Sequence, residues 1–158
     1  MDPHLAPISP ARNSGCRPGI SLTGLRVMVI DDYREAREAL AAILEQRSIQ
    51  VILAESGVAA VNTISGLHVD DLPEVLICDI AMPVYDGYIT LAKIRAWEAE
   101  NDIRIPVPAI AFTAFFQHRD KLKAAAYGFQ AYLTKPLIPE RLYAALAEMI
   151  YLRRSHSR

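Results

Sequence analysis

Short apolar runs alternate with amphipathic segments along most of the chain. The run RVMVI at residues 26–30 is followed by residues 34–46, where apolar residues recur at helical spacing. This alternation is repeated, and it predicts strands at 26–30, 50–54, 75–78, 107–112 and 131–134 and helices at 34–46, 58–64, 88–100, 117–127 and 139–152. Strands with so few polar residues are typical of a parallel sheet that is covered on both faces. We therefore predict an α/β fold, a three-layer α/β/α sandwich around a five-stranded parallel sheet.

The two ends of the chain differ from this alternating region. Residues 1–24 carry four prolines and three glycines, a composition that cannot sustain a helix or a central strand. We predict a flexible leader over residues 1–24, one domain over residues 25–152, and a short, solvated basic tail over residues 153–158. A length of 158 residues fits a single domain.

Carboxylates follow two of the predicted strands directly. Five βα units are compatible with the strand order 2-1-3-4-5, in which a ligand crevice lies at the carboxyl ends of the first and third strands. The first strand runs into Asp31 and Asp32, and the third runs into Asp79. Three carboxylates this close would repel one another unless a cation lay between them. Oxygen donors completed by water suit Mg²⁺.

The last two strands end in residues of complementary chemistry. Thr113 brings a hydroxyl group and Lys135 an ammonium group. A metal ion, a hydroxyl and an ammonium around one carboxylate would stabilise a transferring phosphoryl group, with Asp79 as the nucleophile. Each residue alone has an ordinary structural explanation as a turn, cap, edge-strand or surface residue. Their coincidence at four strand ends favours a site.

Four segments carry a resemblance to a known family. VMVIDDYREAR, LICDIAMPVYDGY, AIAFTA and YLTKP resemble the corresponding segments of response-regulator receiver domains, from about Leu25 to the last helix. The resemblance implies the flavodoxin-like order 2-1-3-4-5 and a phosphorylation switch of a two-component or phosphorelay system. It also implies that the chain is not a classical enzyme, although it would support its own phosphorylation and slow dephosphorylation.

The resemblance gives each matching residue a role. Asp79 is the expected phosphoacceptor. The expected Mg²⁺ ligands are Asp31, Asp32 (the more direct of the pair), Asp79 and the backbone carbonyl of Ala81. Thr113 is the expected switch hydroxyl, Lys135 the phosphate-contacting lysine before a cis peptide bond to Pro136, and Tyr132 the aromatic residue whose rotamer follows the threonine. The loop after the acceptor is matched by Met82, Pro83, Asp86 and Gly87, where glycine would permit a tight turn.

The resemblance implies that two positions near the acceptor influence the lifetime of a phosphorylated state. Ala81 and Phe115 both have side chains that cannot hydrogen-bond an attacking water molecule. We therefore expect slow self-hydrolysis. A half-life of seconds, measured without a phosphatase, would contradict this expectation.

The resemblance also implies partners. A histidine kinase or phosphotransfer protein is the expected phosphoryl donor. A downstream protein or a second copy of the chain is expected to dock on the face formed by the predicted helix 117–127, strand 131–134 and helix 139–152. The expected contact residues are Lys123, Tyr132, Arg141 and Tyr143. For Tyr143, a buried packing role is an open alternative.

Composition narrows the classes of function. The net charge is −1, with 17 basic and 18 acidic residues, so no basic field indicates a nucleic-acid or membrane surface. The sequence shows no secretory signal and no apolar run of membrane-spanning length, which favours a cytoplasmic protein. The alternative of a Mg²⁺-dependent phosphatase with an aspartyl nucleophile is disfavoured, because it needs an acid where Ala81 stands. A degenerate scaffold and a C-terminal receiver detached from a hybrid histidine kinase are the remaining alternatives.

Overall fold

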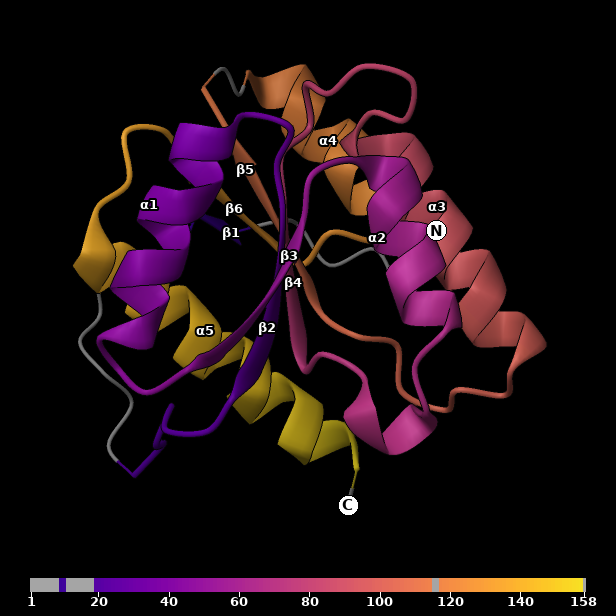
Figure 1. Cartoon of the computed structure of the whole chain (residues 1–158), viewed down its shortest axis with the longest axis horizontal. Helices are drawn as coiled ribbons and strands as arrows, with labels where there is room; N and C mark the ends of the chain where they lie inside the picture. The colour runs from indigo at the N-terminus through magenta and orange to yellow at the C-terminus, as the bar shows by residue number, and fades with distance from the viewer. Residues whose placement is uncertain (1–8, 11–18, 115–116, 158) are drawn as a thin grey trace.

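The computed structural model describes residues 9–10, 19–114 and 117–157. They form a parallel sheet of order β1-β6-β5-β4-β2-β3 (Figure 1). The strands are β1 (Ser9–Pro10), β2 (Arg26–Ile30), β3 (Gln50–Ala54), β4 (Val75–Cys78), β5 (Ala109–Thr113) and β6 (Ala131–Thr134). The helices are α1 (Arg34–Glu45), α2 (Gly57–Ser65), the short 3₁₀ helix η1 (Val69–Asp71), α3 (Gly87–Glu100), α4 (His118–Tyr127) and α5 (Pro139–His156).

The predicted sheet is confirmed, and one short strand is added to it. In order along the sheet, β3, β2, β4, β5 and β6 are the predicted arrangement 2-1-3-4-5. The sequence did not predict β1, which pairs with the outer edge of β6 inside the segment expected to be a flexible leader. Pro10 has no N–H to donate, and proline is tolerated at a sheet edge for that reason. The flexibility of the leader stays a prediction.

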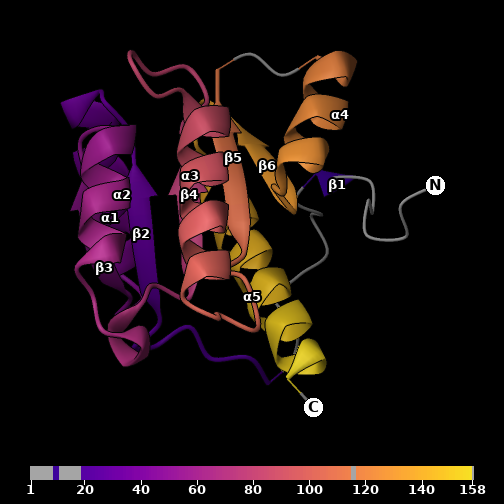
Figure 2. The ribbon, with the colours of Figure 1, turned by 90° about the vertical axis from the view of Figure 1, so that its right-hand side faces the viewer.

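Helices cover both faces of the sheet (Figures 1 and 2). Helices α1 and α5 lie on one face, and α2, α3 and α4 lie on the other. Successive residues of a strand point to opposite faces, so β2 supplies Met28 and Ile30 to one core and Val27 and Val29 to the other. Two buried cores explain why the strands have no polar face. No helix among the described residues has both the length and the apolar character needed to span a bilayer.

Both ends of the packed domain lie outside the predicted limits. Leu22 is buried in the core under α1 and α5, three residues before the predicted start. The predicted basic tail is wrong for its first residues, because α5 continues to His156. Arg153 is half-buried and its Nη1 donates to the carbonyl oxygen of Glu74 at 3.1 Å. Basic residues in the last turn also suit the negative end of the helix dipole.

A buried ion pair joins α3 to the connections around it. Glu98 is buried, and its carboxylate accepts hydrogen bonds from Arg95 at 2.7 Å and from the backbone N–H of Val107 at 2.7 Å. Arg95 also donates to the carbonyl oxygens of Val107 and Gly128. The pair thus fixes the segment that leads into β5 and the turn between α4 and β6.

We expect Glu98→Ala to lower the free energy of unfolding by about 3 kcal/mol, because it leaves a buried N–H without an acceptor and Arg95 without its counter-charge. Urea denaturation followed by circular dichroism measures the change. Glu100→Ala, an exposed position on the same helix, is the matched control and should change stability by less than about 0.5 kcal/mol. Equal effects of the two variants would show that the buried pair contributes nothing special.

Candidate functional site

The pairing of β2 with β4 brings the first and third strand ends together. Ile30 and Cys78 are partners in the register, so the residues that follow them, Asp31 and Asp79, emerge side by side. The backbone N–H of Asp79 donates to the carbonyl oxygen of Ile30 at 2.9 Å. The strand order predicted from the sequence therefore delivers the expected juxtaposition.

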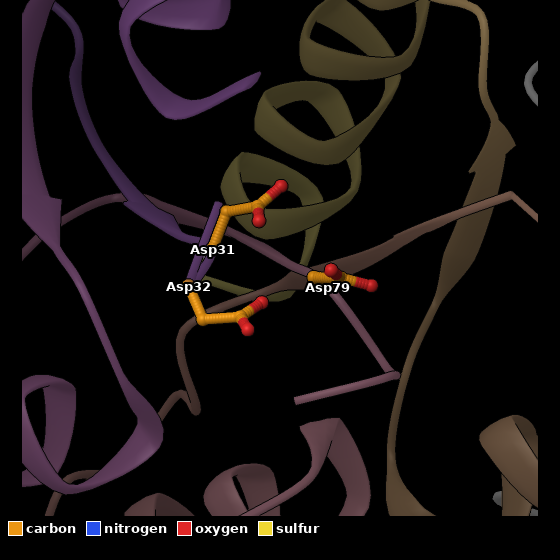
Figure 3. A group of neighbouring side chains, drawn as sticks. All are labelled: Asp31, Asp32 and Asp79. Carbon is orange, nitrogen blue, oxygen red and sulfur yellow. The ribbon is translucent and has the colours of Figure 1, made fainter. Parts of the chain in front are cut away.

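Three carboxylates form one cluster at this edge of the sheet. Asp31, Asp32 and Asp79 each offer an oxygen, and these oxygens all lie within 4.8 Å of one another (Figure 3). Asp31 and Asp79 are buried, whereas Asp32 is exposed. The cluster thus has a buried floor and one carboxylate open to solvent. Its all-oxygen donors fit a hard divalent cation.

Lys135, the residue that follows β6, neutralises part of this negative charge. The Nζ atom of Lys135 lies 3.1 Å from Oδ2 of Asp31 and 3.5 Å from Oδ2 of Asp79. The peptide bond from Lys135 to Pro136 is cis, as the resemblance predicted. The ammonium group is thus held beside both buried carboxylates.

The electrostatics of the site mark Asp79 as the unusual carboxylate. Burial raises the pKa of Asp79, the positive charge of Lys135 acts to lower it, and the negative charge of Asp31 raises it further. For Lys135, burial alone would lower the pKa, but the hydrogen bond to Asp31 and the charges of Asp79 and Asp31 raise it. Burial also raises the pKa of the neighbouring Cys78 thiol strongly, so this thiol stays protonated and is a poor nucleophile.

Local hydrogen bonds hold the buried carboxylates in place. Oδ1 of Asp31 accepts the backbone N–H of Tyr33 at 2.9 Å, and Arg37 from α1 donates to the Asp31 carbonyl oxygen at 2.8 Å. Oδ1 of Asp79 accepts the backbone N–H of Ala81 at 3.1 Å. The positioning role of Arg37 could not be read from the sequence, because one arginine among several charged residues of a helix gives no distinguishing signal. The expected metal contact of the Ala81 carbonyl stays a prediction.

The loop after Asp79 is fixed by burial, capping and a close backbone approach. Met82 is buried, and Asp86 caps α3 by accepting the backbone N–H of Ile89 at 2.8 Å. A Cβ atom on Gly87 would lie 2.6 Å from the Asp79 carbonyl oxygen and 2.8 Å from Cα of Ile80. The reason expected for this glycine was wrong: Gly87 starts α3 rather than forming a tight turn, and it is needed for this close contact.

We expect Gly87→Ala to push the phosphoacceptor strand end and α3 apart. Overpacking of this kind costs about 1–3 kcal/mol of stability, and misplacement of Asp79 should slow its phosphorylation about 10-fold or more. Denaturation and acetyl phosphate labelling measure the two effects. Gly66→Ala is the control, because a Cβ atom there meets its nearest neighbour at an ordinary 3.6 Å.

The two switch candidates lie at the ends of neighbouring strands. Thr113 ends β5 and is buried, and its carbonyl oxygen accepts the backbone N–H of Lys135 at 2.9 Å. Tyr132 in β6 is also buried, with the Nζ atom of Lys121 5.0 Å from its ring centroid. Their roles in switching stay predictions. Phe115, expected to influence the lifetime of the phosphorylated state, lies outside the described residues.

Neither of the two tyrosines expected on the docking face is exposed there. Tyr143 does not belong to it: its hydroxyl group donates to the carbonyl oxygen of Ile43 in α1 at 2.7 Å, and Arg47 lies over its ring at 4.3 Å. Its alternative packing role is therefore the right one. The burial of Tyr132 likewise contradicts the expectation that it presents itself on that face.

Comparison with known proteins gives a consistent result. The family described as the response regulator receiver domain matches residues 27–147. Protein PilG of Pseudomonas aeruginosa is 35% identical over 123 residues, which cover 78% of this chain and 85% of PilG. Other curated relatives include the histidine kinase mak2 of Schizosaccharomyces pombe and the sensor protein GacS of Pseudomonas syringae, at 33% and 31% identity, and the chain spans only 6% and 13% of their lengths.

Solved structures agree with this match. The receiver domain of the Pseudomonas aeruginosa sensor histidine kinase PA1611, with magnesium coordinated in its active-site cleft, has a TM-score of 0.69 and 28% identity, covering 82% of this chain and 99% of that one. A co-crystal of the Saccharomyces cerevisiae histidine phosphotransfer protein Ypd1 with the receiver domain of its downstream response regulator Ssk1 gives a TM-score of 0.69 and 26% identity, covering 87% and 94%. This chain therefore belongs to the response regulator receiver domain family of two-component signalling.

Proposed function

We propose that this receiver domain is a phosphorylation switch in which Asp79 accepts a phosphoryl group from a phosphohistidine donor. One observation carries the proposal. A buried carboxylate with a raised pKa lies between two further carboxylates and an ammonium group. Buried charge arranged this way, at the edge of a sheet, is typical of a reactive site rather than of a stabilising ion pair.

The residues of the cluster fit a magnesium ion. Asp32, open to solvent, and the buried Asp31 and Asp79 would hold it, with the Ala81 carbonyl as a fourth ligand. When bound, Mg²⁺ supplies positive charge that neutralises the oxygens of the phosphoryl group. The receiver domain of PA1611 holds magnesium in its own active-site cleft.

In the proposed reaction, a carboxylate oxygen of Asp79 forms the new bond to phosphorus as the P–N bond of the donor phosphohistidine breaks. The imidazole nitrogen keeps the electron pair of that bond. Lys135, 3.5 Å from the Asp79 carboxylate, would neutralise charge on the phosphoryl oxygens, and the Thr113 hydroxyl would donate a hydrogen bond to one of them. Both residues would thereby bind the product more tightly than the free carboxylate.

The signal would leave through a change in conformation. New contacts of the phosphoryl group with Thr113 and Lys135 would bias the domain towards a second state, and Tyr132 would report this on the neighbouring strand β6. We propose the α4–β6–α5 face as the surface that a downstream protein or a second copy reads. The exposed side chain of Leu122 on α4 is available there for such a contact.

Mass spectrometry after incubation with acetyl phosphate tests the proposal directly. We expect a single adduct of about 80 Da, the mass added when an acyl phosphate forms. The adduct should require Mg²⁺ and should be lost on addition of EDTA before the donor. Its absence with millimolar donor and Mg²⁺ would overturn the proposal and favour a phosphate-independent scaffold.

A further inference from the structure

Val84, in the loop between β4 and α3, has a backbone conformation that disfavours valine. Its φ angle is +65°, in the left-handed region. A β-branched side chain is crowded there, whereas glycine or asparagine is tolerated. The other non-glycine residues with positive φ among those described are Ser48 and Asp102, which carry no β-branched side chain.

The loop imposes this conformation from both sides. The Ile80 carbonyl oxygen accepts the backbone N–H groups of Met82 and Gly87, at 3.2 and 2.8 Å. Tyr85 packs closely against the start of α2: a Cβ atom added to Gly57 would lie only 2.6 Å from the Cβ atom of Tyr85. These contacts hold the backbone on both sides of Val84, whose left-handed conformation suits glycine or asparagine better than valine.

The valine side chain gives no packing in return. It is 83% exposed, the most exposed large apolar side chain among the described residues. Single exposed apolar residues are common and by themselves indicate nothing. Here exposure is joined to backbone strain, and strain that is not offset by packing within the fold is typical of functional positions.

The position of Val84 indicates which molecule it contacts. It lies five residues after Asp79, in the loop that leaves the carboxyl end of β4. Tyr33, 60% exposed, lies in the loop that leaves the carboxyl end of the adjacent strand β2. Any donor that reaches Asp79 must approach the edge of the sheet from which both loops emerge.

We propose that Val84, together with Tyr33, is a specificity contact for a protein phosphoryl donor that presents apolar side chains beside its phosphohistidine. This inference rests on the proposed phosphorylation of Asp79 and adds the chemistry by which a donor is selected. A small phosphoryl donor has no such surface and does not use the contact.

Val84→Asn in the full chain tests the proposal, because asparagine relieves the strain and removes the apolar contact. We expect a denaturation midpoint no lower than that of the wild type, and phosphorylation by acetyl phosphate within twofold of it. Transfer from histidine phosphotransfer proteins, the yeast protein Ypd1 among them, should lose at least tenfold in kcat/KM. Val69→Asn, which removes an equally apolar exposed side chain from η1, should leave all three measurements unchanged.

Three outcomes would overturn the proposal. They are unchanged protein-donor transfer in Val84→Asn, a fall in its denaturation midpoint, and a wild type that accepts the phosphoryl group from acetyl phosphate but from no phosphotransfer protein tested. Failure of the phosphorylation proposal itself looks different, because the wild type would then gain no adduct from acetyl phosphate either.

Discussion

Asp79→Asn is expected to abolish the phosphoryl adduct, reducing labelling by acetyl phosphate roughly 10⁶-fold or to below detection, as for the loss of a catalytic nucleophile. The amide has the shape of the carboxylate, but it lacks the charged oxygen that attacks phosphorus. The fold should survive, because Asp31 keeps its own bond to Lys135 at 3.1 Å. Burial and the negative charge of Asp31 both raise the pKa of Asp79, which means that they disfavour its charged form. A neutral amide at this position avoids both costs. Intact-protein mass spectrometry and a denaturation curve measure the two effects.

Asp71→Asn, an exposed carboxylate in η1, is the control for this variant and should be labelled like the wild type. An adduct that persists in Asp79→Asn would mean that another carboxylate accepts the phosphoryl group. Reduction of the acyl phosphate with borohydride, followed by peptide mapping, would identify that residue. Asp32, as the exposed member of the cluster, would be examined first.

The sheet could be predicted closely from local patterns. Strands β2, β3, β4 and β6 have the bounds expected from their apolar runs. Strands β2, β4 and β6 are buried almost throughout, and the edge strand β3 keeps an apolar run although part of it is exposed. Strand β1 could not be predicted, since its two residues, Ser9 and Pro10, have no apolar pattern. The last turn of α5 was not predicted either. Its basic residues were expected to be solvated, whereas Arg153 donates to the carbonyl oxygen of Glu74, which is distant in the sequence.

The candidate site was predictable for a different reason. Its residues follow strand ends, so the order of the parallel strands alone brings Asp31, Asp79 and Lys135 together. Contacts that depend on the three-dimensional path of the chain were not predictable. The close approach of Gly87 to the Asp79 backbone and the packing of Tyr143 on α1 both join residues that no sequence spacing relates.

Asp32→Asn is expected to be more stable than the wild type without Mg²⁺ and less stable than the wild type with it, which is the second large effect. Without Mg²⁺, this variant should be more stable than the wild type, because it removes one of three carboxylates whose oxygens lie within 4.8 Å. With Mg²⁺ at about 100 times its Kd, the wild type should gain about 2.7 kcal/mol and the variant almost nothing. Labelling by acetyl phosphate should fall about 100-fold, because the charge that neutralises the phosphoryl oxygens is lost.

Asp31→Asn separates the loss of a metal ligand from the loss of an ion pair. Its carboxylate is buried and bound to Lys135, so the change should destabilise the protein by about 3 kcal/mol even without Mg²⁺, opposite in sign to Asp32→Asn. Thermal denaturation of both variants with Mg²⁺ and with EDTA measures the four values. If Asp32→Asn kept the full Mg²⁺ gain, Asp32 would not be a ligand. If both variants lost stability equally in EDTA, repulsion among the three carboxylates would not determine the stability of the metal-free protein. Other interactions within the fold would then have to offset that repulsion.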